Sequence, residues 1–332
     1  MSNLPINVVA DIGGTNIRLA IIDGAQQLTE IEKYQCREFG SLADVLAHYF
    51  AQKDITQCQI NACLAIACPV ENDQVVMTNM SWSFSQRALK ESLNLNNLWF
   101  INDYTAIAHA IPLLTNEQKV QIGGGEAVAH KPIAVCGPGT GLGVANIVNV
   151  DGQWVCLSGE GGHSDFAPVN EEQVKILQFL FSKYHHVSYE QLLSGLGIEQ
   201  IYQALNHINK QDAPDLSAAE ITELALTSQS DVCTQTLQHF CKILGSFSGN
   251  LALTGGSFGG VYIAGGIVPR FIEFFKDSGF RKCFEHKGRF ENYNQNIPTF
   301  VITESQPGML GASAYLLQQL SFTRQVSQPL LK

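Results

Sequence analysis

The chain alternates between short runs of apolar residues and longer segments in which apolar residues recur every three or four positions. Near its start, residues 8–22 form two apolar, β-branched runs on either side of Gly13-Gly14, which predicts a β-hairpin. Ser41, with Asp44 three positions later, predicts a helix N-terminus. The apolar positions that follow share one face of that helix: Leu42, Val45, Leu46, Tyr49 and Phe50.

Two more apolar runs, residues 62–67 and 98–101, predict strands. Ser85 is placed to open a short helix, and the segment 107–111 predicts a helical stretch that stops at Pro112. The next segment, residues 113–132, is polar and rich in glycine. We therefore place a domain boundary there.

The opening pattern then returns. Residues 132–136 predict a strand, 137–143 a glycine turn and 144–150 a second strand. This second turn begins about 126 positions after the first. A hairpin repeated at that spacing indicates a duplicated α/β unit.

From Glu171 the chain is mainly helical. Ser217 and Glu220 predict another capped helix, and the polar run 206–216 before them predicts a loop. Residues 260–264 predict a strand, followed by a glycine pair and a helix that starts at Pro269. A final helix is expected at residues 307–320.

Strands that alternate with helices over this length predict an α/β protein. The duplication and the polar break predict two lobes with a central cleft. We expect the small α/β lobe to comprise residues 1–113 and, through the returning last helix, about 304–332. The large α/β lobe, with helical insertions, would comprise residues 114–303.

Charge narrows the classes of partner. The 30 acidic and 20 basic side chains give a net charge of −10, and only 15% of the 332 residues are charged. Nucleic acids and anionic membranes are bound through clustered Lys and Arg, so neither is an expected partner. The chain has no apolar run near the ~18 residues of a membrane span, and no basic residue before Arg18 that would suit a signal peptide. A soluble cytoplasmic protein is expected.

The nine cysteines favour the same compartment. Their number is odd, they form no C-x-x-C pair, and most lie in apolar segments. Free buried thiols in a reducing compartment fit this pattern better than disulfides or a zinc site.

Glycine turns carry the candidate chemistry. The P-loop and the G-x-G-x-x-G fingerprint are both absent. The first turn, Asp11-Ile12-Gly13-Gly14-Thr15-Asn16, has glycines that let backbone N–H groups approach a phosphate, and a carboxylate suited to the Mg²⁺ shell of a triphosphate. A plain hairpin turn would explain the glycines but neither Asp11 nor Thr15.

The second turn, Gly137-Pro-Gly-Thr-Gly-Leu-Gly143, has four glycines in seven residues, more than a simple turn needs. It favours a phosphate-binding role. The third, Gly265-Gly266, lies where a strand meets a helix, and a strand-to-helix turn explains it equally well.

Two polar clusters accompany these turns. Asn102-Asp103 follows a predicted strand, where Asp103 is suited to accept the proton of an attacking hydroxyl. Capping of a helix that starts near Thr105 explains the pair equally well. Glu160 and His163, in a glycine-rich loop, present groups that bind vicinal hydroxyls.

These motifs, in this order, resemble the phosphate-1, phosphate-2 and adenosine motifs of sugar kinases in the actin–hexokinase–heat-shock-70 ATPase superfamily. The resemblance is closer to the bacterial glucokinase family of the non-ROK type, and it covers residues 8–320. It extends through Ala65-Ile66-Ala67-Cys68-Pro69, Asn102-Asp103-Tyr104-Thr105-Ala106, the segment 159–168, Leu193-Ser194-Gly195, the segment 259–270 and Lys287-Gly288-Arg289-Phe290.

The resemblance implies a two-lobed, actin-like ATPase (ribonuclease H-like) fold and ATP-dependent phosphorylation of D-glucose to glucose 6-phosphate. Asp103 would be the catalytic base, and the sugar would be bound by Asn102, Asp103, Glu160, His163 and Glu190. Mg²⁺ would be held by Asp11 through water, and a homodimer is expected. ATP would be bound by Ala10, Asp11, Ile12, Gly13, Gly14, Thr15, Asn16, Gly139, Thr140, Gly141, Gly265 and Gly266.

Several of these roles rest on the resemblance alone. Glu190 by itself reads as a first-turn helix glutamate. His163 is a metal ligand in ROK kinases, but the C-x-C-G-x-x-G-C cluster of those enzymes is absent here.

The alternatives are a kinase for mannose or fructose and a non-catalytic, sugar-responsive regulator. A regulator would need a DNA-binding segment of roughly 60–80 residues, and we expect none before Asp11. A superfamily chaperone or cytoskeletal ATPase would not need Glu160 and His163 beside Asn102-Asp103.

Overall fold

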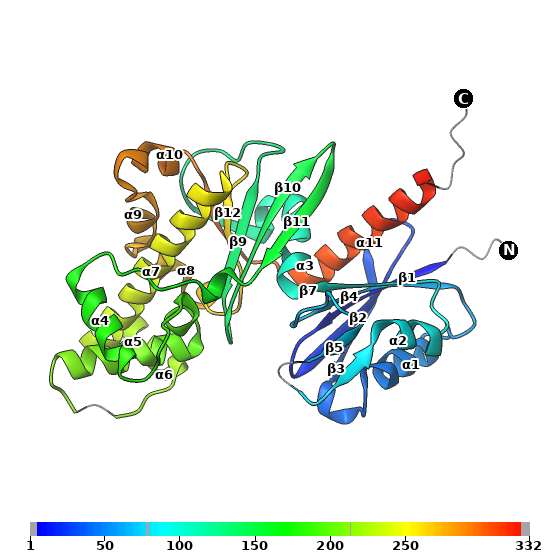
Figure 1. The fold of residues 1–332 in the computed structure, drawn as a ribbon, viewed down its shortest axis with the longest axis horizontal. Coiled ribbons are helices and arrows are strands. Elements are labelled where there is room, and N and C mark those ends of the chain that lie inside the picture. Colours follow the sequence, from blue (N-terminus) through cyan, green and yellow to red (C-terminus); the bar gives the residue numbers. More distant parts are fainter. Residues whose placement is uncertain (1–4, 78–79, 213, 327–332) are drawn as a thin grey trace. The chain divides into compact units, whose positions relative to one another are not determined.

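A computed structural model describes residues 5–77, 80–212 and 214–326, with side chains described as far as residue 323. The chain divides into two compact units, shown by chain order in Figure 1. Unit 1 comprises residues 1–114 and 304–332, and unit 2 comprises residues 115–303. The final helix therefore belongs to the same unit as the first strands.

Unit 1 is built on a five-stranded sheet in the order β3-β2-β1-β4-β7. The predicted hairpin is present as β1 and β2, and β4 and β7 lie parallel to β1. The strands are β1 (Ile6–Ile12), β2 (Asn16–Ile22), β3 (Leu28–Gln35), β4 (Ile60–Ile66) and β7 (Asn97–Asn102), with a separate pair β5 (Gln74–Val76) and β6 (Ser83–Ser85).

Helices cover both faces of this sheet. Alternate residues of β1 point to opposite sides, so Val8 packs in one apolar cluster and Val9 in another. The first cluster lies under α1 and α2, and the second under α3 and α11. The helices are α1 (Leu42–Gln52), α2 (Gln86–Ser92), α3 (Asp103–Ala110) and α11 (Pro307–Val326), with short 3-10 turns η1 (Cys36–Glu38) and η2 (Ile111–Leu113).

The helix starts of unit 1 follow the predicted capping residues. The Ser41 side chain accepts a hydrogen bond from the Asp44 backbone N–H, and Ser85 accepts one from that of Ala88. The buried residues of α1 are the five expected from its periodicity: Leu42, Val45, Leu46, Tyr49 and Phe50.

Unit 2 repeats the same topology. Its six-stranded sheet has the order β11-β10-β9-β12-β13-β8, with the hairpin β9–β10 and with β12 and β13 parallel to β9. The strands are β8 (Lys119–Gly123), β9 (Ile133–Pro138), β10 (Leu142–Val150), β11 (Gln153–Gly159), β12 (Val261–Ile263) and β13 (Thr299–Ile302). The predicted duplication is therefore visible in both sheets.

Most of the helices of unit 2 lie between β11 and β13 in the chain. They are α4 (Glu171–Phe181), α5 (Gly195–Ile208), α6 (Ala218–Leu226), α7 (Asp231–Gly255), α8 (Ile272–Asp277), α9 (Phe280–Glu285) and α10 (Glu291–Gln295). Their 3-10 turns are η3 (Asn116–Gln118), η4 (Gly161–His163), η5 (Tyr189–Gln191), η6 (Val268–Phe271) and η7 (Gly288–Phe290). Ser217 and Glu220 form the predicted capping box at the start of α6.

Four sequence-based element assignments were wrong in part. The polar segment 113–132 contains β8, which pairs with β13 at the sheet edge. The segment 206–216 is not all loop, because α5 continues to Ile208 and the buried Asn206 amide donates to the Tyr202 carbonyl. Pro269 lies in η6, and α8 begins only at Ile272. The final helix extends past residue 320 to Val326.

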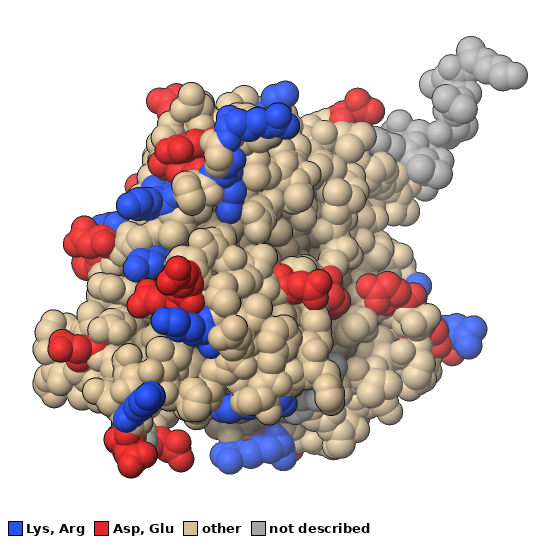
Figure 2. Space-filling model, turned by 60° about the vertical axis from the view of Figure 1, so that its left-hand side comes forward, with Lys and Arg blue, Asp and Glu red and all other residues tan. Residues whose placement is uncertain are grey.

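The surface is consistent with the low fraction of charged residues in the sequence. On the face shown in Figure 2, basic and acidic side chains are interspersed, and most of the surface is neither. Among the described residues, no helix is long and apolar enough to cross a membrane.

Candidate active site

The first glycine turn joins β1 to β2 in unit 1. Gly13 N–H donates to the Asn16 carbonyl at 3.0 Å, which closes the hairpin. Behind the turn, Cys36 N–H donates to the Thr15 carbonyl at 2.9 Å, and the Cys36 thiol lies 3.6 Å from the Gly13 carbonyl oxygen. The Thr15 side chain remains exposed. The turn is thus supported from one side and open on the other.

Asp11 lies one residue before the end of β1, and its carboxylate has two neighbours. Arg18 Nη1 is 3.4 Å from Asp11 Oδ2, and Gly308 at the start of α11 lies so close that an added Cβ would be 3.2 Å from Asp11 Oδ1. Burial raises the pKa of the Asp11 carboxyl, and the positive charge of Arg18 opposes that rise. The carboxylate keeps 26% of its side-chain surface exposed, so a hydrated cation can reach it.

Asn102 and Asp103 occupy the same sheet edge as Asp11. Strands β1, β4 and β7 run parallel, and pairing places Asp11 beside Ala65 and Ala65 beside Ile101. The carboxyl ends of the three strands therefore bring Asp11 and the Asn102-Asp103 pair to one edge, with β4 between them.

The capping interpretation is correct for Asn102. Its Oδ1 accepts hydrogen bonds from the backbone N–H groups of Tyr104 at 2.9 Å and Thr105 at 3.4 Å. Asp103 is the first residue of α3, two positions earlier than the expected start, and its Oδ1 accepts from Tyr104 N–H at 3.0 Å. The helix N-terminus stabilises the ionised carboxylate, which is the form that a base requires.

Cys68 follows β4 near this pair. Burial, with smaller contributions from the negative charges of Asp103 and Glu71, raises the pKa of the Cys68 thiol to about 11. Cys68 therefore stays a neutral thiol at neutral pH and adds no negative charge of its own near Asp103.

The second glycine turn joins β9 to β10 in unit 2. Gly139 N–H donates to the Gly141 carbonyl at 2.8 Å, and Gly195 N–H donates to the Gly139 carbonyl at 3.0 Å. Gly195 is the first residue of α5, whose N-terminus is capped by the Ser194 side chain. The turn is thereby fixed to the start of that helix.

Glu190 connects this turn to the other predicted sugar residues. Its Oε2 accepts a hydrogen bond from Leu142 N–H at 2.8 Å, and its Oε1 lies 3.6 Å from His163 Nε2. A Cβ on Gly141 would overlap the Glu190 carboxylate, so any side chain there would displace that carboxylate. Glu190, His163 and the second turn therefore form one cluster.

Glu160 and His163 lie at the two ends of η4, and both are exposed. The glycines between them are required by close packing on β10: a Cβ on Gly162 would overlap the Leu142 carbonyl, and one on Gly161 would lie 3.1 Å from Val144. The loop is tied to the segment carrying Glu190, because Tyr189 N–H donates to the Ser164 carbonyl at 3.0 Å.

The third glycine pair follows β12. Gly265 has φ +83° and lies directly against the Pro138 carbonyl, a combination that only glycine tolerates well. Gly266 faces open space. This turn is therefore held against the end of β9, next to the second turn.

A cavity of about 870 Å³ adjoins these two turns. Its wall includes Gly139, Thr140 and Gly266, and the remainder comes from α5, α6 and η6. The lining combines apolar with polar side chains, which is typical of pockets of about 300–1,000 Å³ that take small organic ligands. The apolar members are Ile198, Leu226, Ile267 and Phe271, and the polar ones include Glu199, Thr222, Glu223 and Arg270.

Sequence reasoning missed these helix residues. Arg270 is the last residue of the matched segment 259–270 but was given no site role. Phe271 follows it, and the aromatic spacing there predicts core packing, which is confirmed because Phe271 is 4% exposed. The members from α5 and α6 belong to amphipathic helices, and periodicity alone does not separate a cavity wall from a solvated face.

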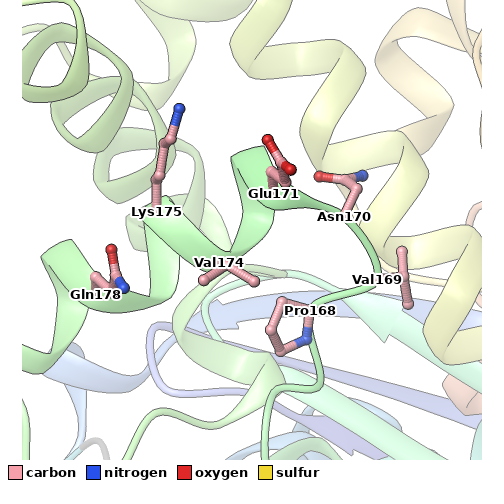
Figure 3. A pocket seen from close by; sticks show the side chains of 7 residues that line it. All are labelled: Pro168, Val169, Asn170, Glu171, Val174, Lys175 and Gln178. Carbon is pink, nitrogen blue, oxygen red and sulfur yellow. The ribbon is translucent and has the colours of Figure 1, made fainter.

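A second cavity, of about 500 Å³, lies beside the start of α4. Figure 3 shows that its lining comes from one segment, residues 168–178, with Pro168, Val169 and Val174 as apolar members. It contains none of the predicted site residues.

Comparisons with known proteins match the whole arrangement. The family model described as Glucokinase matches residues 8–319. The chain belongs to the glucokinase family. It is 62% identical over 318 residues to the glucokinase of Colwellia psychrerythraea, covering 94% of this chain and 96% of that protein.

Two further relatives of the glucokinase family agree. The glucokinase of Photorhabdus laumondii is 51% identical, with 95% of this chain and 98% of that protein covered. The crystal structure of glucokinase from an Antarctic psychrotroph is 38% identical, has a TM-score of 0.87, and covers 95% of this chain and 99% of that one. The predicted family, two-lobed kinase fold and enzyme class, an ATP-dependent glucokinase, are confirmed.

Proposed function

We propose that this glucokinase transfers the γ-phosphoryl group of ATP to the 6-hydroxyl of D-glucose, with Asp103 as the base. The observation that carries the assignment is the position of Asp103 at the N-terminus of α3, at the carboxyl end of β7. There the carboxylate lies at the positive end of the helix dipole and accepts a hydrogen bond from Tyr104 N–H. The neighbouring Asn102 is occupied by capping, which stabilises the backbone that carries Asp103.

The sugar would be oriented by a second set of groups. Glu160, His163 and Glu190 are proposed to bind its hydroxyls together with Asn102 and Asp103. Their support is that Glu190 and His163 are neighbours and that η4 and η5 are joined by backbone hydrogen bonds. Carboxylates accept from hydroxyl groups and imidazole either donates or accepts, so the set suits a polyhydroxylated ligand.

The nucleotide would lie against the glycine turns. We propose that the base and ribose enter the 870 Å³ cavity and that Gly139, Thr140, Gly141, Gly265 and Gly266 contact the nucleotide. In the first turn, Gly13, Gly14, Thr15 and Asn16 would receive the phosphates. Ala10 and Ile12 are fully buried, so they would contribute only through the backbone.

Mg²⁺ fits the residues at the end of β1. The ion is bound in many kinases through one or two carboxylates and the substrate phosphates, with several waters retained. Asp11 supplies one partly exposed carboxylate and would hold the ion through water. When bound, Mg²⁺ neutralises phosphate charge.

The chemical step needs little from the protein besides positioning. Phosphoryl transfer passes through a loose transition state, so the base mainly orients the nucleophile and takes its proton late. Asp103 would hold the 6-hydroxyl by accepting its hydrogen bond and then receive the proton as the new O–P bond forms. The sugar residues and glycine turns would keep the two reacting groups in line.

We further propose a cytoplasmic, homodimeric enzyme of glycolysis that binds neither nucleic acid nor membrane. The net charge of −10, the interspersed surface charges and the apolar setting of the cysteines support this setting.

The test of the base is Asp103→Asn, which keeps size and hydrogen bonding and removes the proton acceptor. Glucose binding by calorimetry should change less than about tenfold, while kcat in a coupled ADP-release assay should fall by about 10³ or more, within the range of general-base losses. Asp23→Asn, in an exposed turn of the same unit, is the matched control and should keep full activity. A kcat near normal in Asp103→Asn would overturn the assignment, and a sugar panel in the same assay tests glucose against mannose and fructose.

A further inference from the structure

The Glu190 carboxylate lies between two groups that the proposed reaction uses separately. One oxygen accepts a hydrogen bond from Leu142 N–H at 2.8 Å, at the end of the second glycine turn. The other lies 3.6 Å from Nε2 of His163. With no Cβ on Gly141, the carboxylate occupies the space beside the turn backbone. The same side chain therefore touches the second glycine turn and faces His163, another of the proposed sugar residues.

The backbone of Glu190 has little freedom to move away. Ser188 and Gln191 form a capping box around η5, and Gln200 Nε2 donates to the Gln191 carbonyl at 2.9 Å. On the other side of Glu190, Tyr189 is 3% exposed and packs against Phe247 with ring centroids 4.6 Å apart. A shift of the carboxylate must therefore come from its own side-chain torsions or from movement of the turn.

Two contacts hold the turn in addition to the β9–β10 ladder, in which Leu142 pairs with Pro138. Gly139 is bonded through its carbonyl to Gly195, at the start of α5. Leu142 N–H is bonded to Glu190. Gly139 and Thr140, which lie between these two anchors, form part of the cavity wall. The position of Glu190 therefore bears on the shape of the nucleotide surface.

A carboxylate has about four lone-pair positions, so Glu190 accepts from a sugar hydroxyl and from Leu142 N–H at the same time. A sugar bound on Oε1 would restrict the side-chain torsions and so hold Oε2 on Leu142 N–H. A nucleotide that orders the turn would restrict the same carboxylate from the other side. Each ligand would then meet a group already ordered by the other.

We infer that Glu190 couples the two substrates, so that glucose raises the affinity for nucleotide and nucleotide raises the affinity for glucose by the same factor. This inference rests on the proposed function, which assigns glucose to Glu190 and phosphates to the second turn. By linkage, the coupling is one free energy measured from either side.

The test measures glucose affinity by calorimetry with and without a saturating non-hydrolysable ATP analogue and Mg²⁺. The wild type should show coupling of about tenfold, within the usual range of about 5–150-fold. Gly141→Ala, which displaces the carboxylate, should reduce coupling to less than about twofold and weaken glucose binding in the absence of nucleotide. Gly141 is not one of the proposed sugar residues. Weakened glucose binding in Gly141→Ala would therefore show that the second glycine turn acts on glucose through the Glu190 carboxylate.

Gly24→Ala, in the β2–β3 turn of unit 1, is the glycine-to-alanine control outside the proposed site. Its added Cβ would meet nothing within 4 Å. Glucose binding without nucleotide should therefore stay within about twofold of wild type. Circular dichroism and the thermal midpoint, measured for each variant, exclude misfolding as the cause of a loss.

The outcomes separate the inference from the proposed function. Coupling below about twofold in the wild type, or tenfold coupling retained in Gly141→Ala, would overturn the inference. Glu190→Ala with unchanged glucose affinity would instead show that the sugar assignment of Glu190 is wrong. A Glu190→Ala variant that binds glucose weakly but keeps wild-type coupling would overturn the inference and leave that assignment standing.

Discussion

Gly141 and Gly308 perform the same task in different units, since each leaves out a side chain where a carboxylate lies. In unit 2 the carboxylate is that of Glu190, and in unit 1 it is that of Asp11. In both places the glycine lets backbone approach an acidic side chain closely. Substitution there changes the position of the carboxylate directly.

Gly308→Ala is predicted to impair the use of Mg²⁺ and ATP. The added Cβ would lie 3.2 Å from Asp11 Cγ and Oδ1, a contact that moves the carboxylate by a few tenths of an ångström. We expect KM for Mg-ATP to rise about tenfold, which corresponds to about 1.4 kcal/mol, with glucose affinity unchanged. Initial rates over a range of ATP and Mg²⁺ concentrations measure this.

The matched control for this prediction is Gly24→Ala in the β2–β3 turn of the same unit, where an added Cβ meets open space. It should behave as wild type. If Gly308→Ala shows an unchanged KM for Mg-ATP, Asp11 does not act at the nucleotide in the way proposed.

Sequence reasoning at this scale succeeds where the cause is local. Ser41 caps the helix beside it, and the cap and its donor Asp44 are three positions apart. The contact of Glu190 with Leu142 joins residues 48 positions apart, so no local pattern contains it. The family resemblance selects Glu190, but the contact with the glycine turn required coordinates.

At the scale of elements, α3, which begins with Asp103, packs closely against α11. A Cβ on Gly311 would overlap the Ala106 carbonyl, so the two helices approach with backbone against backbone. His109 of α3 is buried in this contact, with its ring 5.2 Å from that of Tyr315. A charged imidazole there would lose hydration.

This burial predicts a pH dependence of stability. Burial lowers the pKa of His109 from an ordinary value of 6.5 to about 4. Between these values the unfolded chain binds a proton that the folded chain does not, so the free energy of unfolding falls as pH falls from about 6.5 to 4. Between pH 7 and 4.5 the loss from this group is on the order of 2 kcal/mol.

Urea unfolding at several pH values, followed by circular dichroism, measures the effect. His109→Gln should flatten the pH dependence, whereas His185→Gln, at an exposed histidine, should leave it unchanged. Equal slopes for wild type and His109→Gln would contradict the prediction.

The elements that pattern reasoning missed or cut short have two physical causes. β3 and β8 are edge strands: β3 carries charged residues that interrupt its alternation, and β8 alternates but is only five residues long. α5 extends past its predicted end because Asn206 is satisfied by the Tyr202 carbonyl inside the core. The strands were decided by pairing with distant strands, which lies outside any local window, whereas the Asn206 contact spans only four positions within α5.

At the scale of the molecule, the proposed nucleotide residues belong to both units: Gly13 to Asn16 in unit 1, and the turns at 139–141 and 265–266 in unit 2. Hydrogen exchange tests this distribution. A non-hydrolysable ATP analogue with Mg²⁺ should slow amide exchange at residues 13–16 and also at 139–141 and 265–271. Residues 23–26, in the β2–β3 turn, are the internal control and should not change.

Slowed exchange confined to one unit would contradict the proposed distribution of phosphate contacts. This distribution was suggested by the duplication, which could be recognised in the sequence because glycine-rich turns are rare and one begins each half of the chain. The part of the cavity wall formed by α5 and α6 could not be predicted from the sequence, because its residues are scattered along the two helices and form no contiguous motif.

The return of α11 to unit 1 has a consequence for the order of events during synthesis. Unit 2 is one continuous stretch, residues 115–303, whereas one face of the unit 1 sheet is covered by Met309, Ala312 and Leu316 from near the end of the chain. A ribosome releases residues in sequence order, so Val9 and Ala65 lack their α11 partners throughout the translation of unit 2, and only α3 is available to cover that face. We therefore expect unit 1, whose synthesis begins first, to complete its folding last. During that interval the nascent chain should depend on chaperones.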